Sequence, residues 1–266
     1  MVLVKILDNG SACWGELLGD TIRLLSGPPY AGIAYSGETR PAGGARYLAP
    51  CDPTKIVAVG KNYADHIAEL DSVVPEDPTI FLKPPTALND PDADIPLPPH
   101  AVSRRIDYEG ELAFVVSRTA RHVCAQDAPG YILGYTILND VTARDLQRRD
   151  VQWTRAKGFD GFAPVGPVLT DAVDPMDCGI RTRINGRTVQ KSNTGRMLWD
   201  VYRLFEFITA FMTLLPGDVV TTGTPEGVGE MTDGDVVEIE IDGIGILRNR
   251  AVCPSGTPDP DRPGTV

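Results

Sequence analysis

The segment from Ile106 to Val116 is the sequence feature that most constrains how this chain can fold. Its second half, Ala113 to Val116, is a continuous apolar run of the kind that forms a buried β-strand. Side chains two positions apart on a strand point to the same face, so Glu109 and Glu111 should project side by side. Two carboxylates so placed repel each other unless one is protonated or a cation lies between them. The alternative interpretation is an acidic strand edge exposed to solvent.

A third carboxylate is available at Asp140. The segment from Tyr135 to Asp140 is predicted to be a strand, and Val141 to Gln147 is predicted to begin a helix that Thr142 could cap. Asp140 therefore lies at a strand end, where loops gather ligands. Carboxylate oxygens suit Mg2+, Mn2+ or Ca2+, whereas zinc prefers histidine and cysteine. Three carboxylates around one divalent ion would leave the other octahedral positions for water or substrate oxygens.

A candidate general base follows the predicted strand from Lys55 to Gly60. The next ten residues have helical character, and His66 and Glu69 would be i and i+3 neighbours on that helix. The carboxylate could then orient the imidazole and raise its basicity. A surface histidine with a helix-stabilising partner is the alternative. The polar, proline-broken segment from Asp71 to Pro78 suits a mobile lid.

Two further residues could contact an anion. Lys157 lies in a Gly- and Pro-rich stretch with little other charge, and beside a metal it could hold a substrate carboxylate or oxyanion. Thr224 lies in a glycine-rich turn after a predicted strand, where its hydroxyl and nearby backbone N–H groups could serve an anion. This turn lacks the G-K-[ST] ending of a phosphate loop.

Composition favours a fold of many short strands and turns. The 266 residues suit one large domain, or one large and one small, and 27 glycines and 23 prolines exceed average usage. The formal net charge of −11 argues against nucleic acid or an anionic membrane as a partner, because both require a basic face. An acidic substrate would instead need a metal ion or particular lysines and arginines.

The cysteines and the N-terminus predict a soluble protein in the cytoplasm. The five cysteines are scattered and include no C-x-x-C pair, so we expect reduced thiols and no disulfide frame or zinc site. The N-terminus lacks the basic and apolar segments of a signal peptide. No stretch approaches the roughly 20 apolar residues of a membrane span.

Three parts are predicted along the chain. Residues 1–50 form a small N-terminal β domain packed on the main domain. Its strands are predicted at Val2 to Ile6, Cys13 to Leu18 and Thr21 to Leu25. Residues 51–253 form the main domain, and residues 254–266 are too rich in Pro, Gly and Asp to fold.

The other predicted elements of the main domain are structural. The Asn185-Gly186 pair is a strong turn signal for a hairpin from Arg181 to Val189. Apolar residues at helical spacing predict a core or interface helix from Met197 to Leu215. Two last strands are predicted on either side of Asp242-Gly243, and Asp90 to Pro99 is expected to be a loop.

Five motifs that occur in this order resemble the fumarylacetoacetate hydrolase (FAH) family over residues 55 to 252. They are Gly60-Lys61-Asn62-Tyr63 with His66, Asp107-Tyr108-Glu109-Gly110-Glu111-Leu112, Asn139-Asp140-Val141-Thr142-Ala143-Arg144-Asp145-Leu146-Gln147, Lys157-Gly158-Phe159-Asp160 and Thr222-Gly223-Thr224-Pro225-Glu226-Gly227-Val228-Gly229. Each motif is weak alone, but their coincidence is specific. The chain looks most like the shorter branch with acylpyruvate hydrolases, oxaloacetate decarboxylases and 2-hydroxyhepta-2,4-diene-1,7-dioate isomerases.

The resemblance implies a fold and a set of site residues. The fold would be mainly β with some α, a mixed β-sandwich roll whose FAH-type catalytic domain spans residues 51–253, usually as a homodimer. Mg2+ or Mn2+ would be held by Glu109, Glu111 and Asp140, with Lys157 nearby. The general-base dyad on a lid would be His66 and Glu69. Substrate contacts would come from Tyr63, Arg144, Gln147 and Thr224.

The favoured reaction is hydrolysis of a C–C bond in an acylpyruvate-type 2,4-dioxo acid. The ion would stabilise a pyruvate enolate, while water activated by His66 attacks the distal carbonyl. The same enolate would allow decarboxylation or tautomerisation of oxaloacetate, or isomerisation of a dienedioate. From a different class, the chain could be a metal-holding fold that binds dioxo acids without turnover, although the intact His66, Glu69 and Lys157 argue against a pure binder.

Overall fold

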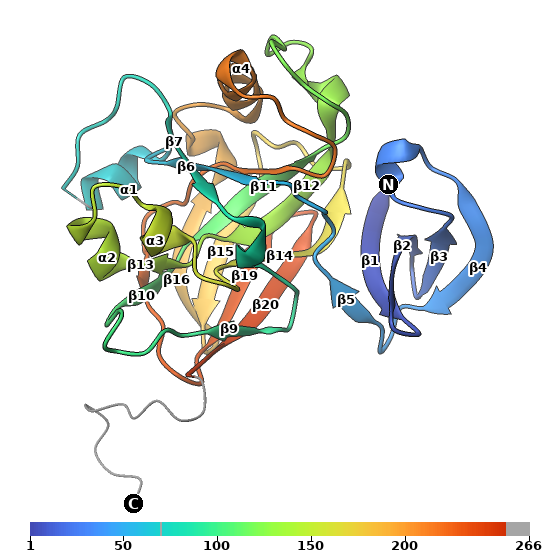
Figure 1. Ribbon diagram of the computed structural model, residues 1–266, viewed down its shortest axis with the longest axis horizontal. Coiled ribbons are helices and arrows are strands. Elements are labelled where there is room, and N and C mark those ends of the chain that lie inside the picture. The colour runs from blue at the N-terminus through green and yellow to red at the C-terminus, as the bar shows by residue number, and fades with distance from the viewer. Residues whose placement is uncertain (70, 254–266) are drawn as a thin grey trace, which may run out of the picture.

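The computed structural model describes residues 1–69 and 71–253, and it is mainly β with a few short helices (Figure 1). This confirms the predicted fold class. The segment 254–266, which the sequence predicts not to fold, lies outside the described residues. No helix in the described part of the chain is long and apolar enough to cross a membrane. The described residues, which include all five cysteines, contain no disulfide, as predicted.

Twelve strands form the largest sheet, in the order β4-β3-β2-β1-β14-β12-β11-β17-β6-β7, with β5 paired to β1 and β8 paired to β14. Their bounds are β1 Val2–Asp8, β2 Ser11–Leu18, β3 Thr21–Leu25, β4 Tyr35–Pro41, β5 Arg46–Leu48, β6 Ile56–Gly60, β7 Thr79–Lys83, β8 Leu88–Asn89, β11 Gly110–Val116, β12 Ile132–Asn139, β14 Ala163–Thr170 and β17 Val219–Thr221. Most neighbouring pairs are antiparallel, but β17 runs parallel to β6 and β8 runs parallel to β14.

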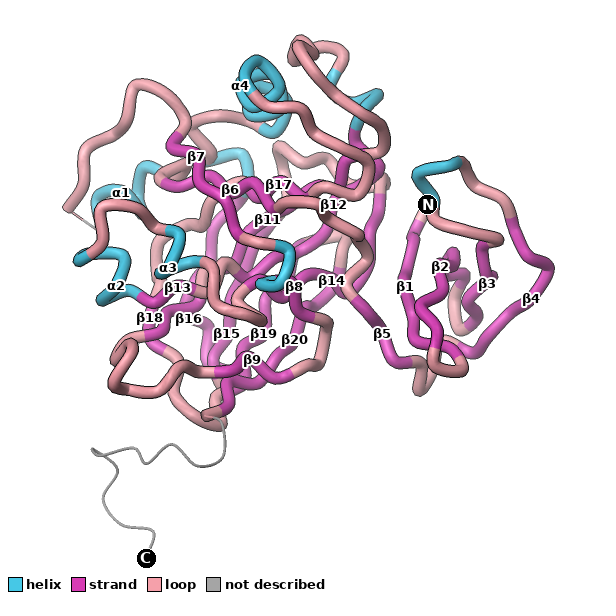
Figure 2. The backbone as a smooth tube through the Cα atoms, in the orientation of Figure 1, coloured by secondary structure: helices cyan, strands magenta, loops and turns pink. Residues whose placement is uncertain are grey.

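Two smaller sheets complete the strand structure of the described residues (Figure 2). The five-stranded sheet has the order β16-β15-β19-β20-β9, and the three-stranded sheet has the order β13-β10-β18. Their bounds are β9 Asp94–Pro96, β10 Ile106–Tyr108, β13 Thr142–Ala143, β15 Gly179–Ile184, β16 Arg187–Asn193, β18 Gly229–Glu230, β19 Val236–Ile241 and β20 Gly245–Val252. The predicted hairpin at Asn185-Gly186 and the last two strands are confirmed.

The helices are short and lie around the sheets (Figure 1). The α-helices are α1 Ala64–Glu69, α2 Arg144–Arg149, α3 Thr154–Lys157 and α4 Val201–Phe211, and the 3-10 helices are η1 Pro29–Ala31, η2 Pro85–Ala87, η3 Ala128–Tyr131 and η4 Thr194–Arg196. Helix α4 begins where the Asp200 carboxylate accepts hydrogen bonds from the backbone N–H groups of Tyr202 (3.0 Å) and Arg203 (2.9 Å), a side-chain N-cap.

Strand β11 is the centre of the main core. All seven of its residues are buried, which explains why Leu112 to Val116 form a continuous apolar run with no polar alternation. On one face, Leu112 and Phe114 belong to the same core cluster as Ile180, Ile239 and Leu247 of the five-stranded sheet. The two sheets thus enclose one core, as in a β-sandwich. Complete burial of each large apolar side chain stabilises the fold by about 1.5–3 kcal/mol.

The N-terminal strands form a unit beside the main body (Figure 1). The three strands predicted there are present, and β4 and β5 are two more that the sequence did not indicate. Strand β1 pairs with β14 through Val2 opposite Thr170 and Leu3 opposite Leu169, so the unit extends the large sheet. The division of the chain into domains at residue 50 stays a prediction.

Four predicted elements differ from the structure. The strand from Ile106 to Val116 is interrupted at Glu109 and contributes to two sheets as β10 and β11. The predicted loop at 90–99 contains β9, which pairs with β20. The helix predicted from Val141 begins only at Arg144, because Thr142 lies in β13 and donates its hydroxyl to the Asp140 carbonyl (2.8 Å), so Thr142 is not the cap.

Helix α4 is also shorter than the helix predicted from Met197 to Leu215. Leu198 and Trp199 donate their backbone N–H groups to Asn62, to its carbonyl (2.8 Å) and to its side-chain oxygen (2.9 Å) respectively. At the other end, Leu214 forms an isolated bridge with Ala120. Both flanking segments therefore make tertiary hydrogen bonds, although their apolar spacing continues the helical pattern.

Candidate metal centre and active site

Four strand ends that are far apart in the sequence meet at one edge of the large sheet. Strand β11 runs antiparallel to β12 and β17, and β17 runs parallel to β6. The start of β11 therefore lies beside the ends of β12, β17 and β6. This arrangement brings together Glu111, Asp140, the turn after Thr221 and the segment that begins at Lys61.

Three buried carboxylates converge at this edge. One oxygen each of Glu109, Glu111 and Asp140 lie within 4.8 Å of one another. Glu109 occupies the break between β10 and β11, and its carbonyl accepts a hydrogen bond from the Asp140 N–H (2.8 Å). Its own N–H donates to the Asn139 side-chain oxygen (3.0 Å). The predicted triad is thus assembled by pairing of the β11 and β12 ends.

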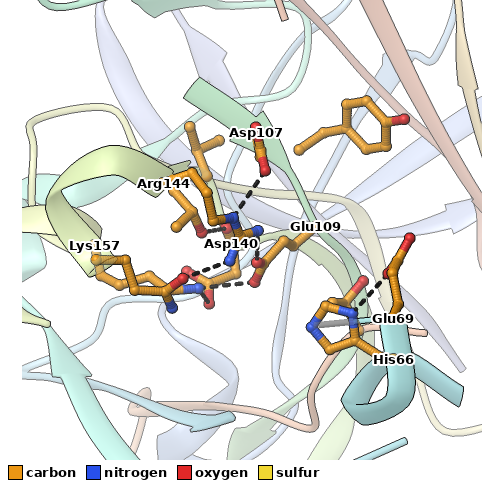
Figure 3. Close-up of polar contacts among 12 residues, drawn as sticks. His66, Glu69, Asp107, Glu109, Asp140, Arg144 and Lys157 are labelled. Carbon is orange, nitrogen blue, oxygen red and sulfur yellow. Dashed lines mark hydrogen bonds and ion pairs between the residues drawn. The ribbon is translucent and has the colours of Figure 1, made fainter. Parts of the chain in front are cut away.

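Cationic side chains surround two of these carboxylates (Figure 3). Lys157 Nζ lies 2.8 Å from Glu109 Oε2 and 2.5 Å from Asp140 Oδ2. Lys83 Nζ, from the end of β7, lies 2.5 Å from Asp140 Oδ1. Arg144 donates a hydrogen bond from one guanidinium nitrogen to Glu109. All three cationic side chains are buried, so each depends on these acidic partners.

Glu111 differs from the other two because its hydrogen-bond donors within residues 1–69 and 71–253 are neutral. Its Oε2 accepts from the Thr221 hydroxyl and from the Gly223 N–H, the latter at 2.9 Å. Burial, together with the charges of Asp140 and Glu109, raises the pKa of Glu111 well above its usual range. Burial also acts to raise the pKa of Glu109, but the charges of Lys157 and Arg144 outweigh it and lower that pKa.

These residues fit a divalent cation. The donor set consists of carboxylate oxygens only, which Mg2+ and Mn2+ prefer, and the three oxygens are close enough to share one ion. Glu111 is the carboxylate that forms no ion pair in the described part of the chain, and a bound ion would supply a positively charged partner. We call Glu109, Glu111, Asp140 and Lys157 the cavity floor.

The cavity above this floor has a volume of about 200 Å³. Its other polar or aromatic lining residues come from helices and loops, and we call five of them the cavity rim. The rim residues are Lys61, His66, Ser72, Arg148 and Trp153. Arg144, Gln147 and Thr224 also line the cavity. The floor is buried, whereas Arg148 is exposed and Lys61, Ser72 and Trp153 are half-buried.

The predicted dyad is formed on α1. His66 Nδ1 lies 3.1 Å from Glu69 Oε2, and His66 is buried and lines the cavity. The other oxygen of Glu69 accepts a hydrogen bond from the Gly227 N–H (3.0 Å), which fixes the carboxylate. In Figure 3, His66 and Lys157 approach Glu109 from opposite sides of the view. An imidazole held by a carboxylate in this way is suited to move a proton at the cavity wall.

The four predicted substrate-binding residues divide into two groups. Arg144 and Gln147 line the cavity and are linked, because Arg144 donates to the Gln147 side-chain oxygen at 2.5 Å. Thr224 lines it too, but its hydroxyl donates to the Gly110 carbonyl (2.9 Å) and is thereby occupied. Tyr63 does not line the cavity: it is 1% exposed, so the structure does not bring its side chain to the cavity wall.

Several residues of the site have no role in the sequence-based interpretation. The sequence predicts Lys83 only as the end of a short apolar strand. Pairing of β7 with β6 brings this strand to the metal site. Asp107 is buried and accepts from Arg144 Nε (2.8 Å), which orients the guanidinium. The rim residues Lys61, Arg148 and Trp153 line the cavity. A lysine at the end of an apolar strand was the one signal that could have indicated Lys83.

Comparisons with known proteins agree with this architecture. The family model described as fumarylacetoacetate (FAA) hydrolase C-terminal matches residues 55–252, and the Rv2993c-like, N-terminal model matches residues 1–50. Protein Rv2993c of Mycobacterium tuberculosis is 49% identical over 241 residues, which is 90% of this chain and 90% of that protein.

Two relatives carry names that describe an activity. A protein of Bos taurus named oxaloacetate tautomerase FAHD2A, mitochondrial, is 41% identical over 219 residues, which is 77% of this chain and 69% of that protein. A crystal structure named 2-hydroxyhepta-2,4-diene-1,7-dioate isomerase from Mycobacterium marinum has 44% identity and a TM-score of 0.89, covering 96% of this chain and 99% of that chain. The chain belongs to the fumarylacetoacetate hydrolase family of enzymes, in the shorter branch that includes these two relatives.

Proposed function

We propose that this protein is a divalent-metal-dependent enzyme that hydrolyses a C–C bond in an acylpyruvate-type 2,4-dioxo acid, of the fumarylpyruvate or acetylpyruvate class. The observation that carries the proposal is the juxtaposition of the carboxylate floor with the His66–Glu69 dyad at one cavity. Mg2+ or Mn2+ is the proposed cofactor, held by Glu109, Glu111 and Asp140. When bound, the ion supplies an electron sink that stabilises negative charge on the 2-keto oxygen of an oxo acid.

The residues of the chain have distinct proposed roles. His66, oriented by Glu69, takes a proton from water as the water oxygen attacks the C4 carbonyl. The C3–C4 bond then breaks, its electron pair moves into the pyruvate enolate, and the acyl group leaves as a carboxylic acid. Lys157 pairs with Glu109 and Asp140 and lies at the floor, where it offers positive charge to a developing oxyanion. Arg144 and Gln147 orient the substrate carboxylate.

A second candidate is oxaloacetate tautomerisation or decarboxylation. Its support is the name of the Bos taurus relative, which is 41% identical over 219 residues. Tautomerisation needs the same enolate but no water, and His66 would carry the proton between oxygen and carbon. Isomerisation of a dienedioate is a third candidate, favoured by the name of the Mycobacterium marinum structure.

Side-by-side assays separate these candidates from one another and from a protein that only binds. Acetylpyruvate, fumarylpyruvate and oxaloacetate are each incubated with the protein and Mg2+, then with EDTA in place of the metal. Release of pyruvate from either acylpyruvate, lost with EDTA, supports hydrolysis. Loss of the enol absorbance of oxaloacetate without pyruvate release supports tautomerisation, and with pyruvate release it supports decarboxylation. No turnover of any of the three acids leaves the isomerase and the binder, which a fourth assay with 2-hydroxyhepta-2,4-diene-1,7-dioate separates. A homodimer is expected from the family resemblance, and light scattering after gel filtration measures it.

A further inference from the structure

We propose that Lys61 and Arg148 form a second anion subsite at the cavity rim, so that the substrate is an oxo acid carrying another carboxylate at its far end. This inference rests on the proposed function, because it assumes that the first carboxylate of the substrate lies at the floor. It selects fumarylpyruvate-like dicarboxylates over acetylpyruvate-like monocarboxylates.

The first support is the distribution of charge. The cationic groups at and beside the floor are already engaged: Lys157 and Lys83 contact carboxylates, and Arg144 contacts both Asp107 and Glu109. Lys61 and Arg148 line the same cavity, and neither forms an ion pair within residues 1–69 and 71–253. In a chain of net charge −11, two uncompensated cations facing one cavity are a selective feature.

The second support is the backbone at Lys61. Its φ of 58° is left-handed, a conformation that lysine rarely adopts. The neighbouring Asn62 fixes it, because the Asn62 amide donates to the carbonyls of Trp199 (3.0 Å) and Thr222 (2.7 Å). Uncommon backbone conformations that the surrounding structure holds in place are concentrated at functional sites. The conformation of Lys61 therefore indicates that its position at the cavity wall has a function. Lys61, the first residue after β6, lines the cavity at this point.

The third support is the aromatic wall that connects the two cations. Trp153 follows α2, the helix of Arg148, and its ring packs so closely on Gly60 that a Cβ there would lie 2.8 Å from a ring carbon. The ring also meets Phe81 edge to face at 5.3 Å between centroids. Trp153 therefore packs against the residue before Lys61, and it gives the chain of a longer substrate an apolar surface between the floor and the two charges.

A binding experiment tests the subsite without turnover. The ligands are 2-oxoglutarate and 2-oxopentanoate, which have the same five-carbon chain and differ only in the distal carboxylate. Their dissociation constants are measured by calorimetry with Mg2+ present. We expect wild-type protein to bind 2-oxoglutarate about 10- to 100-fold more tightly, the range for a charge-assisted contact. The same measurement with a pair of ligands that are one carbon longer tests whether the second subsite lies farther from the floor.

Variants identify the residues responsible. In Arg148→Gln and in Lys61→Gln/Arg148→Gln, the preference for 2-oxoglutarate should fall stepwise toward one. Arg149→Gln is the matched control, because Arg149 is the exposed neighbour that does not line the cavity and contacts Asp150 at 3.7 Å. Its preference should equal that of wild type. Arg148 is exposed, so its single variant tests the idea even if the double variant is unstable.

The outcomes distinguish this inference from the proposed function. A wild-type preference near one, or a preference that survives in the double variant, overturns the subsite and leaves the hydrolase proposal intact. A preference that disappears in the variants, in a protein that hydrolyses no acylpyruvate, supports the subsite and rejects the proposed reaction. Hydrolysis of fumarylpyruvate with kcat/KM at least about tenfold above that for acetylpyruvate, lost in the double variant, supports both.

Discussion

The floor and the rim of the cavity are built in different ways. The floor carboxylates lie at strand ends inside the sheet, are buried and are each held by at least two polar contacts. The rim comes from the segment after β6, from the short helices α1 and α2, and from loops, and part of it is exposed. The loop at 71–78 carries Val73 and Val74, which are 81% and 53% exposed.

The difference suggests a division of labour. A buried cluster of opposite charges has a fixed geometry, because any displaced partner would leave an unpaired charge in a low-dielectric site. Such a cluster suits the electron sink that every proposed reaction needs. A rim of loops and short helices can change with little effect on the fold, and it would determine which substrate enters and where a proton goes. The following predictions test this division.

Removal of a floor ligand should have the largest effect. In Glu109→Ala, one carboxylate is lost and Lys157 and Arg144 lose a partner, so Mg2+ binding and activity should disappear together. We expect about a ten-thousandfold loss of kcat/KM, which corresponds to several kcal/mol of charge stabilisation. Calorimetry with Mg2+ and a pyruvate-release assay measure the two properties. Glu206→Ala, an exposed acidic residue on α4, is the control. Full activity in Glu109→Ala would refute the site.

Removal of the rim base should separate chemistry from metal binding. In His66→Ala, hydrolysis should fall about a thousandfold, the usual contribution of a positioned general base. The affinity for Mg2+ should change by less than about threefold, because His66 pairs with Glu69 and forms no hydrogen bond or ion pair with a floor carboxylate. Glu69→Gln, which weakens only the orientation of the ring, should lose less activity. A large loss of metal affinity in His66→Ala would break the distinction between rim and floor.

A substitution at Asp107 tests whether the orientation of Arg144 beside the floor matters for activity. It accepts from Arg144 Nε at 2.8 Å and does not line the cavity, so it acts through Arg144. Asp107→Asn should reduce kcat/KM about 10- to 100-fold, as expected when an oriented partner is lost. Most of the effect should appear in KM if Arg144 binds the substrate carboxylate. An unchanged KM with a reduced kcat would instead assign Arg144 to the chemical step.

Glu111 tests the cation without any substrate. A bound ion at 100 times its Kd stabilises the fold by about 2.7 kcal/mol, or about 5–10 °C in Tm for a chain of this size. We expect that rise when Mg2+ is added to metal-free protein, and EDTA should reverse it. Glu111→Gln should abolish the rise and leave the metal-free protein at least as stable, because it removes the carboxylate without a cationic partner. An equal rise in the variant would exclude Glu111 as a ligand.

The smallest effect is expected at the loop of the rim. Val73→Ser changes a side chain that is 81% exposed, so the free energy of unfolding should change by less than about 0.5 kcal/mol. If the loop closes over substrate as the lid hypothesis requires, KM should rise about twofold or more. An unchanged KM would indicate that the Val73 side chain has no part in closure over the substrate.

The sequence predicted much of the fold because most of its signals are local. Alternating and continuous apolar runs identified three of the five strands of the N-terminal unit, β11 and the final hairpin, and Asn185-Gly186 identified a turn. The same local reasoning extended α4 too far, because the backbone N–H groups of residues 198 and 199 donate to Asn62, which is far away in the sequence, and this holds both residues outside the helix. It also joined β10 and β11, because nothing in the local pattern marks the break at Glu109.

By itself, the sequence determined which residues could carry the chemistry: the three carboxylates, the dyad and Lys157 stand out by residue type and spacing. Only the tertiary structure decided which cation neutralises which carboxylate. Lys83, Arg144 and Asp107 enter the cluster through strand pairing and side-chain reach, and Glu111 is left with neutral donors. The physical reason is that Coulomb interactions depend on distance in space, which the separation of residues along the chain does not specify.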